Sequence, residues 1–226
     1  YCVMMDVKTG GILAMANMPN FDPNNYSAVD SSVWNNFAVS GMYEPGSTFK
    51  ILTASMFLDD GVTTPDDNYY CSGTYKMGND PTPIKCHIWP RGHGAETFAQ
   101  AVANSCNPVM AELVLKLGAD PFYRYIEAFG LKEKTGIDVP GEALGLVLDE
   151  DNARIRDYGA MAIGQTNAFT PIQMVTAISA VANGGYLMTP YVVDRINDKD
   201  GNLVEKTEPH VVRQVISEKT SKEMRS

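Results

Sequence analysis

The chain begins and ends with short apolar runs that come in pairs around turns, a pattern typical of strands. Residues 3–7 and 12–16 flank Lys8-Thr9-Gly10 and predict a β-hairpin. A second hairpin is predicted at residues 191–206, where two apolar runs flank Asp200-Gly201. We therefore expect strands at both ends of the chain.

Between these hairpins, apolar residues recur at the spacing of helices. The segment 47–61 begins with Ser47 and is apolar on nearly all sides, which predicts a buried helix. Helical spacing returns over residues 96–130, with two breaks, and over residues 170–183. Because the strands do not alternate with the helices, this order favours an α+β fold with a mostly antiparallel sheet.

The composition is that of one globular domain or most of one. The chain has 226 residues, of which 44% are hydrophobic and 20% charged, enough to bury a core. Residues 62–94 differ, because they are rich in Gly, Pro, Asn and Asp, and we expect an irregular loop region with one short hairpin there. The chain starts without Met inside a predicted strand, so residues 1–226 are expected to be a partial domain of a longer protein.

Charge excludes one class of partner. The formal net charge is -9 and the acidic residues are scattered, which leaves no basic face for phosphates, so nucleic acid is not expected. No apolar run reaches the roughly 18 residues of a membrane span. The N-terminus also lacks a signal-peptide pattern, so any anchor would lie outside this chain.

Ser47 and Lys50 are candidates for nucleophilic chemistry. Their spacing of three in a helix places both side chains on one face. A serine hydroxyl needs a base, and a lysine can be that base when desolvation lowers its pKa. Ser-x-x-Lys occurs in a chain of this length about once by chance. A lysine inside an apolar helix, directly after Pro45-Gly46-Ser47, makes the catalytic interpretation stronger.

Ser105 and Asn107 lie at a break between two predicted helices. Residues two apart can point the same way there while Cys106 points back. Ser105 could relay a proton, and the Asn107 amide could hold a substrate carbonyl or amide group. The alternative is that both residues only cap the helices.

Together these stretches resemble a known family. EPGSTFK at residues 44–50 and Ser105-Cys106-Asn107 are similar to the first two active-site motifs of penicillin-binding transpeptidases. DVKTGGILAMANMPNFDPN, GHGAETFAQAVANSCNP, KTGIDVPGE and AIGQTNAFTPIQMVTAISAVANGG agree with that family in order. The likeness covers the whole chain and is greatest to class B, monofunctional members of Gram-positive, clostridial type that act in division or sporulation.

The resemblance implies a penicillin-binding/β-lactamase-like serine acyltransferase fold and a peptidoglycan D,D-transpeptidase activity. Ser47 would attack the D-alanyl-D-alanine end of a stem peptide, and the amine of a neighbouring stem would convert the acyl-enzyme into a cross-link. Lys50 would be the base, Ser105 would carry the proton to the leaving group, and Asn107 would hold substrate. β-Lactam antibiotics would acylate the same Ser47.

The resemblance also implies the setting of the enzyme. No cofactor is required for catalysis. The parent protein would be anchored by an N-terminal helix outside this chain, at the extracytoplasmic face of the membrane. Wall-synthesis proteins of division or sporulation are its expected partners.

The family's third motif, a Lys-Thr-Gly on a sheet edge, is expected after Ser226. The two copies present, Lys8-Thr9-Gly10 and Lys134-Thr135-Gly136, come too early and are interpreted as turns. We therefore expect the fragment alone to be inactive.

Residues 71–93 contain a second group of reactive side chains. Cys71, Cys86, His87 and His93 are the donor types that zinc binds, with Asp80 as an extra oxygen ligand. Their spacing matches no standard zinc finger. A Cys71–Cys86 disulfide and free thiols beside surface histidines are equal alternatives. Cys2, in a predicted strand, is interpreted as a small core residue.

Two other functions compete with the transpeptidase. A β-lactamase needs a group that activates water, and the loop around Glu142 lacks the Glu-x-x-x-Asn pattern of class A enzymes. A non-catalytic interaction module of the same fold is the other alternative, supported only by the missing third motif. The sequence leaves the cross-link type and the oligomeric state open.

Overall fold

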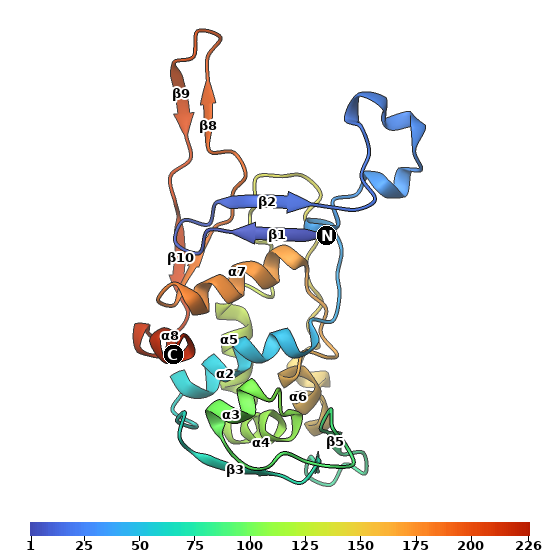
Figure 1. The fold of residues 1–226 in the computed structure, drawn as a ribbon, viewed down its shortest axis with the longest axis vertical. Helices are drawn as coiled ribbons and strands as arrows, with labels where there is room; N and C mark the ends of the chain where they lie inside the picture. The colour runs from blue at the N-terminus through green and yellow to red at the C-terminus, as the bar shows by residue number, and fades with distance from the viewer.

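Helices form the centre of the computed structural model, which describes residues 1–226, and short antiparallel strand pairs surround them (Figure 1). The α-helices are α1 (Phe37–Ser40), α2 (Lys50–Asp59), α3 (Phe98–Ala103), α4 (Asn107–Leu117), α5 (Ala119–Ala128), α6 (Ile155–Ala162), α7 (Pro171–Ala182) and α8 (Glu218–Met224). The strands are β1 (Cys2–Met5), β2 (Ile12–Ala16), β3 (Asn68–Cys71), β4 (Thr74–Tyr75), β5 (Ile84–Lys85), β6 (Gly94–Thr97), β7 (Tyr186–Met188), β8 (Arg195–Asn197), β9 (Leu203–Lys206) and β10 (Val211–Gln214). The architecture is α+β, as predicted.

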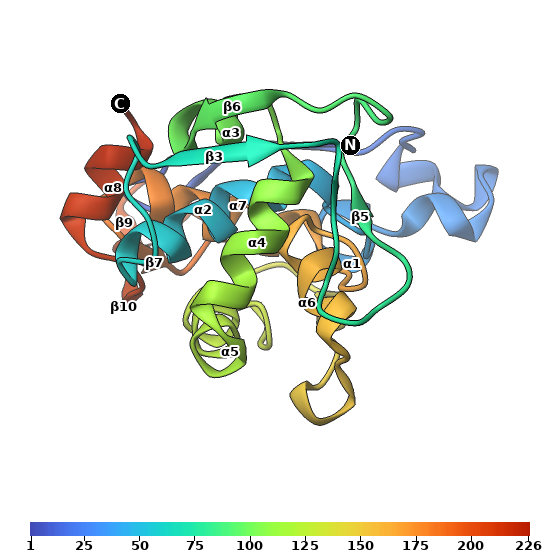
Figure 2. The ribbon, with the colours of Figure 1, turned by 90° about the horizontal axis from the view of Figure 1, so that it is seen from below.

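Helix α2 is the central element of the core. It contacts α4, α7 and α8, and Figure 2 shows it between α4 and α7. Most of its apolar side chains are fully buried, Leu52 and Phe57 among them, and burying one such side chain stabilises the fold by about 1.5–3 kcal/mol. The predicted buried helix is therefore confirmed. Its start differs from the prediction, because a 3-10 turn (Gly46–Phe49) precedes α2 and Ser47 lies inside that turn instead of capping the helix.

Helix α7 begins where the sequence predicts it. Thr170 is its N-cap and forms a capping box with Gln173, in which each side chain bonds the backbone N–H of the other residue at 3.2 and 3.1 Å. Pro171 occupies the first turn, where its missing N–H costs nothing. The β1–β2 pair lies over this helix (Figure 1).

The strand pairs near both ends of the chain match the predicted hairpins, but the predicted burial of one residue in them is wrong. β1 pairs with β2 and β8 pairs with β9, both antiparallel, as predicted. Cys2 is exposed, so its interpretation as a core residue is wrong. In β1 the Met5 side chain points toward α7 and is buried, while Cys2 and Met4 are exposed. The β8–β9 hairpin extends away from the body of the molecule (Figure 1).

Residues 62–94 contain the predicted short hairpin, as β4 paired with β5. Two further antiparallel pairs, β3 with β6 and β7 with β10, have no counterpart in the predicted pattern. These strands are two to four residues long, too short for alternation to be detected. None of the helices has the combined length and apolar character needed to cross a bilayer.

Candidate active site

Ser47 lies at the surface, three residues before the buried Lys50. It belongs to the 3-10 turn that leads into α2, and Lys50 is the first residue of that helix, with 3% exposure. Phe49 anchors the turn in the core, because its ring is fully buried and stacks on Phe169 with 5.7 Å between the ring centroids. The Ser47 hydroxyl is therefore open to a substrate, while the Lys50 side chain is removed from water.

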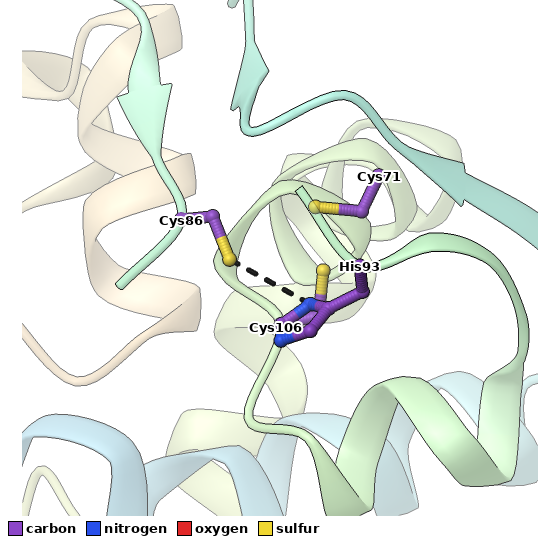
Figure 3. A group of neighbouring side chains, drawn as sticks. All are labelled: Cys71, Cys86, His93 and Cys106. Atoms are coloured by element: carbon purple, nitrogen blue, oxygen red, sulfur yellow. Dashed lines mark hydrogen bonds between the residues drawn. The ribbon is translucent and has the colours of Figure 1, made fainter. Parts of the chain in front are cut away.

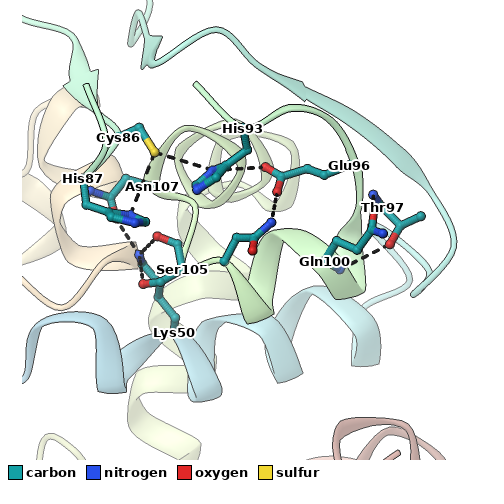
Figure 4. Close-up of polar contacts among 10 residues, drawn as sticks. Lys50, Cys86, His87, His93, Glu96, Thr97, Gln100, Ser105 and Asn107 are labelled. Carbon is teal, nitrogen blue, oxygen red and sulfur yellow. Dashed lines mark hydrogen bonds and ion pairs between the residues drawn. The ribbon is translucent and has the colours of Figure 1, made fainter. Parts of the chain in front are cut away.

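Lys50 joins the two sequence motifs through hydrogen bonds. Its Nζ donates to the backbone oxygen of Ser105 at 2.7 Å, to Ser105 Oγ at 2.9 Å and to Asn107 Oδ1 at 2.5 Å (Figure 4). Ser105 Oγ in turn donates to Ser47 Oγ at 3.0 Å. The four predicted residues Ser47, Lys50, Ser105 and Asn107, called here the serine cluster, are thus one connected network.

The environment of Lys50 favours its neutral form. Burial lowers its pKa to about 8, because a desolvated ammonium group is disfavoured. The charges of Cys106 and Cys86, when ionised, act in the opposite direction and raise this pKa. A lysine with this pKa is partly neutral near physiological pH, as a general base requires.

Ser105 is held in an uncommon backbone conformation. It lies between α3 and α4 with a φ of 53°, in the left-handed region that disfavours residues other than glycine. Cys106 N donates to Ala101 O at 2.8 Å, and Asn107 Nδ2 donates to Lys85 O on β5 at 2.8 Å. With these contacts in place, Ser105 and Asn107 both face Lys50.

A second group of side chains adjoins the serine cluster at Cys106. Cys71, Cys86, His93 and Cys106 each offer a donor atom, and all four atoms lie within 4.8 Å of one another (Figure 3). We call this group the thiol cluster. All cysteines of the chain are free thiols, and Cys86 Sγ lies 3.6 Å from His93 Nδ1.

The members of the thiol cluster differ from the predicted set by one residue. Cys106 takes the place that the sequence assigned to His87, whose Nδ1 lies 4.0 Å from Cys86 Sγ and whose side chain is exposed. Asp80 does not belong to the group either, and its Oδ1 accepts a hydrogen bond from Thr82 N. The sequence does contain an indication for Cys106. Because Ser105 and Asn107 face Lys50, the residue between them points the other way, toward the loop region at residues 62–94.

Glu96 is a buried carboxylate beside the thiol cluster. It is 4% exposed, and its Oε2 accepts a hydrogen bond from Asn104 Nδ2 at 2.9 Å. Its Oε1 lies 3.6 Å from His93 Nδ1 and has no hydrogen-bond partner (Figure 4). Burial, with a smaller contribution from Glu96, raises the pKa of the Cys106 thiol. Glu96 could not be predicted from the sequence, because an acidic residue directly before a helix is usually solvent-exposed.

The first Lys-Thr-Gly copy lies in a turn, as predicted, and the second lies in an irregular loop. Lys8-Thr9-Gly10 connects β1 to β2, and Asp6 Oδ1 accepts a hydrogen bond from Lys8 N at 2.8 Å. At the second copy, Thr135 N and Oγ1 both donate to Glu142 Oε1 at 2.6 Å. Glu142 therefore holds a loop together.

Comparison with known proteins gives a consistent result. The family model described as penicillin binding protein transpeptidase domain matches residues 1–226. The chain is 42% identical to Stage V sporulation protein D of Bacillus subtilis (strain 168), over 99% of this chain and 34% of that protein. It therefore spans about a third of the length of this curated relative.

Solved structures show the same fold. A crystal structure of penicillin binding protein 3 from Mycobacterium tuberculosis, complexed with aztreonam, has a TM-score of 0.88 and 31% identity, and covers 99% of this chain and 49% of that chain. The D,D-transpeptidase domain of a peptidoglycan glycosyltransferase from Eggerthella lenta has a TM-score of 0.89 and 30% identity, and covers 99% and 58%. The predicted fold family is confirmed.

Proposed function

The chain belongs to the penicillin-binding protein transpeptidase domain family, and from this premise we propose that its parent protein is a peptidoglycan D,D-transpeptidase that uses Ser47 as the nucleophile. The observation that carries the proposal is the continuous hydrogen-bonded network from Ser47 through Ser105 to Lys50. Residues 1–226 form part of the transpeptidase domain. A related protein was crystallised with the β-lactam aztreonam, which supports β-lactams as ligands of this site.

The reaction begins with loss of the Ser47 proton. When Lys50 is neutral, its Nζ lone pair accepts the proton of Ser105, and Ser105 Oγ accepts that of Ser47. Ser47 Oγ forms a bond to the carbonyl carbon of the penultimate D-alanine. The bond from that carbon to the terminal D-alanine nitrogen then breaks, and the nitrogen takes a proton back through Ser105. The products are a serine ester and free D-alanine.

The second half of the reaction resolves the ester. The amine of a neighbouring stem peptide attacks the ester carbon, Lys50 accepts the amine's proton, and Ser47 Oγ leaves and is reprotonated. Asn107 positions Lys50 through Oδ1 and holds substrate at the same edge. In a β-lactam the ring amide is the bond that breaks, so the leaving nitrogen stays attached and the acyl-enzyme persists.

The proposed setting is the extracytoplasmic face of the membrane. Stem peptides ending in D-Ala-D-Ala are the substrates, and proteins of division or sporulation wall synthesis are the partners. The similarity to a stage V sporulation protein favours sporulation. The β-lactamase alternative gains no support, because the Glu142 carboxylate accepts hydrogen bonds from Thr135 N and Oγ1 and so holds a loop together.

Labelling with fluorescent penicillin tests the nucleophile in the full-length protein. The Ser47→Ala variant should lose the label completely, because no other oxygen occupies its position. Ser72→Ala is the matched control, since Ser72 is also exposed and its hydroxyl bonds only to Thr74 O. Labelling of Ser47→Ala at the wild-type level would refute the assignment.

We also propose that the thiol cluster binds zinc as a structural metal. Three cysteine sulfurs and one imidazole are a donor set of closed, tetrahedral zinc sites. With zinc–sulfur and zinc–nitrogen bonds of about 2.3 and 2.1 Å, a tetrahedral site separates sulfur from nitrogen by about 3.6 Å, and Cys86 Sγ and His93 Nδ1 are 3.6 Å apart. The unpartnered oxygen of Glu96 next to His93 also suits a positive centre.

Metal analysis of the purified protein tests the zinc proposal. We expect one equivalent in the wild type and loss of the metal in Cys86→Ser. Cys2→Ser should keep it, because Cys2 is exposed on β1. The variants His93→Asn and His87→Asn distinguish the thiol cluster from the donor set predicted from the sequence, which included His87 in place of Cys106. His93→Asn should lose zinc and His87→Asn should keep it. Cysteines that all react with a thiol reagent without a chelator would refute the site, as would a Cys71–Cys86 disulfide.

A further inference from the structure

The loop at residues 164–169 is joined to the segment directly before Ser47. Tyr43 and Phe169 exchange backbone hydrogen bonds at 3.1 and 3.0 Å, and Gly46 N donates to Gly164 O at 2.8 Å. Between these two contacts, Glu44 Oε1 accepts a hydrogen bond from Thr166 N at 2.8 Å. This is the one side-chain hydrogen bond between the two segments, and the other hydrogen bonds between them join backbone groups.

Thr166 needs such a contact because its backbone is strained. Its φ is 74°, in the left-handed region, where a β-branched residue is a genuine outlier. Residues in this conformation persist only where the surroundings hold them in place. Thr166 is exposed, so packing does little to hold it, and its amide donates a hydrogen bond to the Glu44 carboxylate.

The strained loop is in direct contact with the residue before the nucleophile. A Cβ atom on Gly164 would lie 2.1 Å from Gly46 O, so the two backbones touch with no space between them. Gly46 itself has a φ of 57°. A change in the loop conformation at Thr166 would therefore reach Gly46, the residue before Ser47, through the contact with Gly164.

We propose that Glu44 is a positioning residue for the reaction of Ser47. Its carboxylate holds the Thr166 amide, keeps the loop at residues 164–169 in its strained form and so fixes the Gly46–Ser47 turn. This inference rests on the proposed role of Ser47 and is independent of the thiol cluster. Glu44 acts through the backbone and does not contact the substrate.

Acylation kinetics of the full-length protein with a chromogenic β-lactam test the proposal. Glu44→Ala should lower the second-order acylation rate constant about tenfold, as expected for loss of one charge-assisted hydrogen bond. Glu44→Gln should stay within about threefold of the wild type, because its amide oxygen still accepts the Thr166 N–H. Glu205→Ala, which removes an exposed carboxylate from β9, is the control and should have no effect.

A second substitution separates positioning from a general structural role. Glycine adopts a φ of 74° without strain, so Thr166→Gly should relieve the need for the carboxylate. In that background, Glu44→Ala should cost less than about twofold in acylation, a clear departure from additivity. Hydrogen exchange of the Thr166 and Gly46 amides should accelerate in Glu44→Ala and return toward the wild-type rate in the double variant.

The outcomes distinguish this inference from the proposed function. If the wild type is acylated but Glu44→Ala reacts at the same rate, the positioning role is overturned and the function of Ser47 stands. Equal losses in Glu44→Ala and Glu44→Gln, or a full loss that persists with Thr166→Gly, also overturn it. If no β-lactam acylates the wild type, the proposed function is overturned. In that case the positioning role is still tested separately, because an unchanged hydrogen-exchange rate of the Gly46 amide in Glu44→Ala would overturn it.

Discussion

The serine cluster and the thiol cluster meet at one residue and differ in how their polar atoms are satisfied. In the serine cluster, each hydrogen of the Lys50 ammonium group has an acceptor in Ser105 or Asn107. In the thiol cluster, Cys106 lies among weak donors and acceptors, and the nearby Glu96 Oε1 has no hydrogen bond. The serine cluster is therefore complete with protein groups alone, whereas the thiol cluster has more potential metal-donor atoms than hydrogen bonds to satisfy them, and a bound cation would satisfy these atoms.

The comparison predicts its largest effect for removal of the cation in the serine cluster. Lys50→Met should lower β-lactam acylation about a thousandfold, within the range that a general base contributes. The fold should survive, because methionine fills a similar buried volume without a charge. Stopped-flow acylation and a thermal melt of the same sample measure both effects. Lys116→Met, which removes an exposed lysine paired with Glu112, should react normally.

The second prediction concerns pH, and its sign follows from the lowered pKa of Lys50. Because only neutral Lys50 accepts a proton, acylation should fall about tenfold per pH unit below its pKa of about 8, and about a hundredfold by pH 6. The unfolded chain binds this proton more tightly, so stability should rise with pH between about 8 and 10.5, the usual pKa of a lysine side chain. A pH–rate profile that stays flat from 6 to 8 would contradict Lys50 as the base.

Metal removal tests whether the thiol cluster supports the serine cluster. Because Cys106 lies between Ser105 and Asn107, treatment with a strong chelator should lower acylation on the order of thirtyfold, as small displacements of catalytic groups do. Adding zinc back should restore the rate, which an irreversible loss of structure would prevent. A chelated protein that has lost its zinc but reacts at the wild-type rate would show that the two clusters are independent.

The smallest effect is expected at Glu96. Glu96→Gln should keep an acceptor for Asn104 but lose the charge beside His93, and zinc affinity should fall about tenfold. Competition with a coloured chelator measures this change, and acylation at saturating zinc should change less than twofold. Glu112→Gln on α4 is the control. Unaltered zinc affinity in Glu96→Gln would show that this carboxylate does not support the site.

Each half of the serine cluster was predictable because its spacing is local, whereas the pairing of the two halves was predicted from the family resemblance. Ser47 and Lys50 are related by helical spacing, and Ser105 and Asn107 by a two-residue step, so the sequence indicates which side chains point the same way. What the sequence could not show is the order of the contacts. In the structure Ser105, 58 residues from Ser47, lies between that hydroxyl and Lys50.

The thiol cluster was predicted less completely because its geometry is not local. Cys71 ends β3 and His93 precedes β6, so the pairing of these two strands brings the two residues together. Strands this short leave no periodic signal, and adjacency in sequence favoured His87 over Cys106. The exposure of Cys2 has a related cause, since a strand that covers a helix on one face leaves alternate residues on the other.

The left-handed backbone of Ser105 has a consequence for attempts to engineer this domain. At a φ of 53°, serine costs on the order of 1 kcal/mol or more relative to glycine. A library selected for heat resistance alone would therefore enrich Ser105→Gly, which relieves the strain and deletes the hydroxyl between Ser47 and Lys50. The Ser105→Gly variant would be more stable but catalytically inactive. Selection for stability must therefore keep Ser105 unchanged or include a selection for turnover.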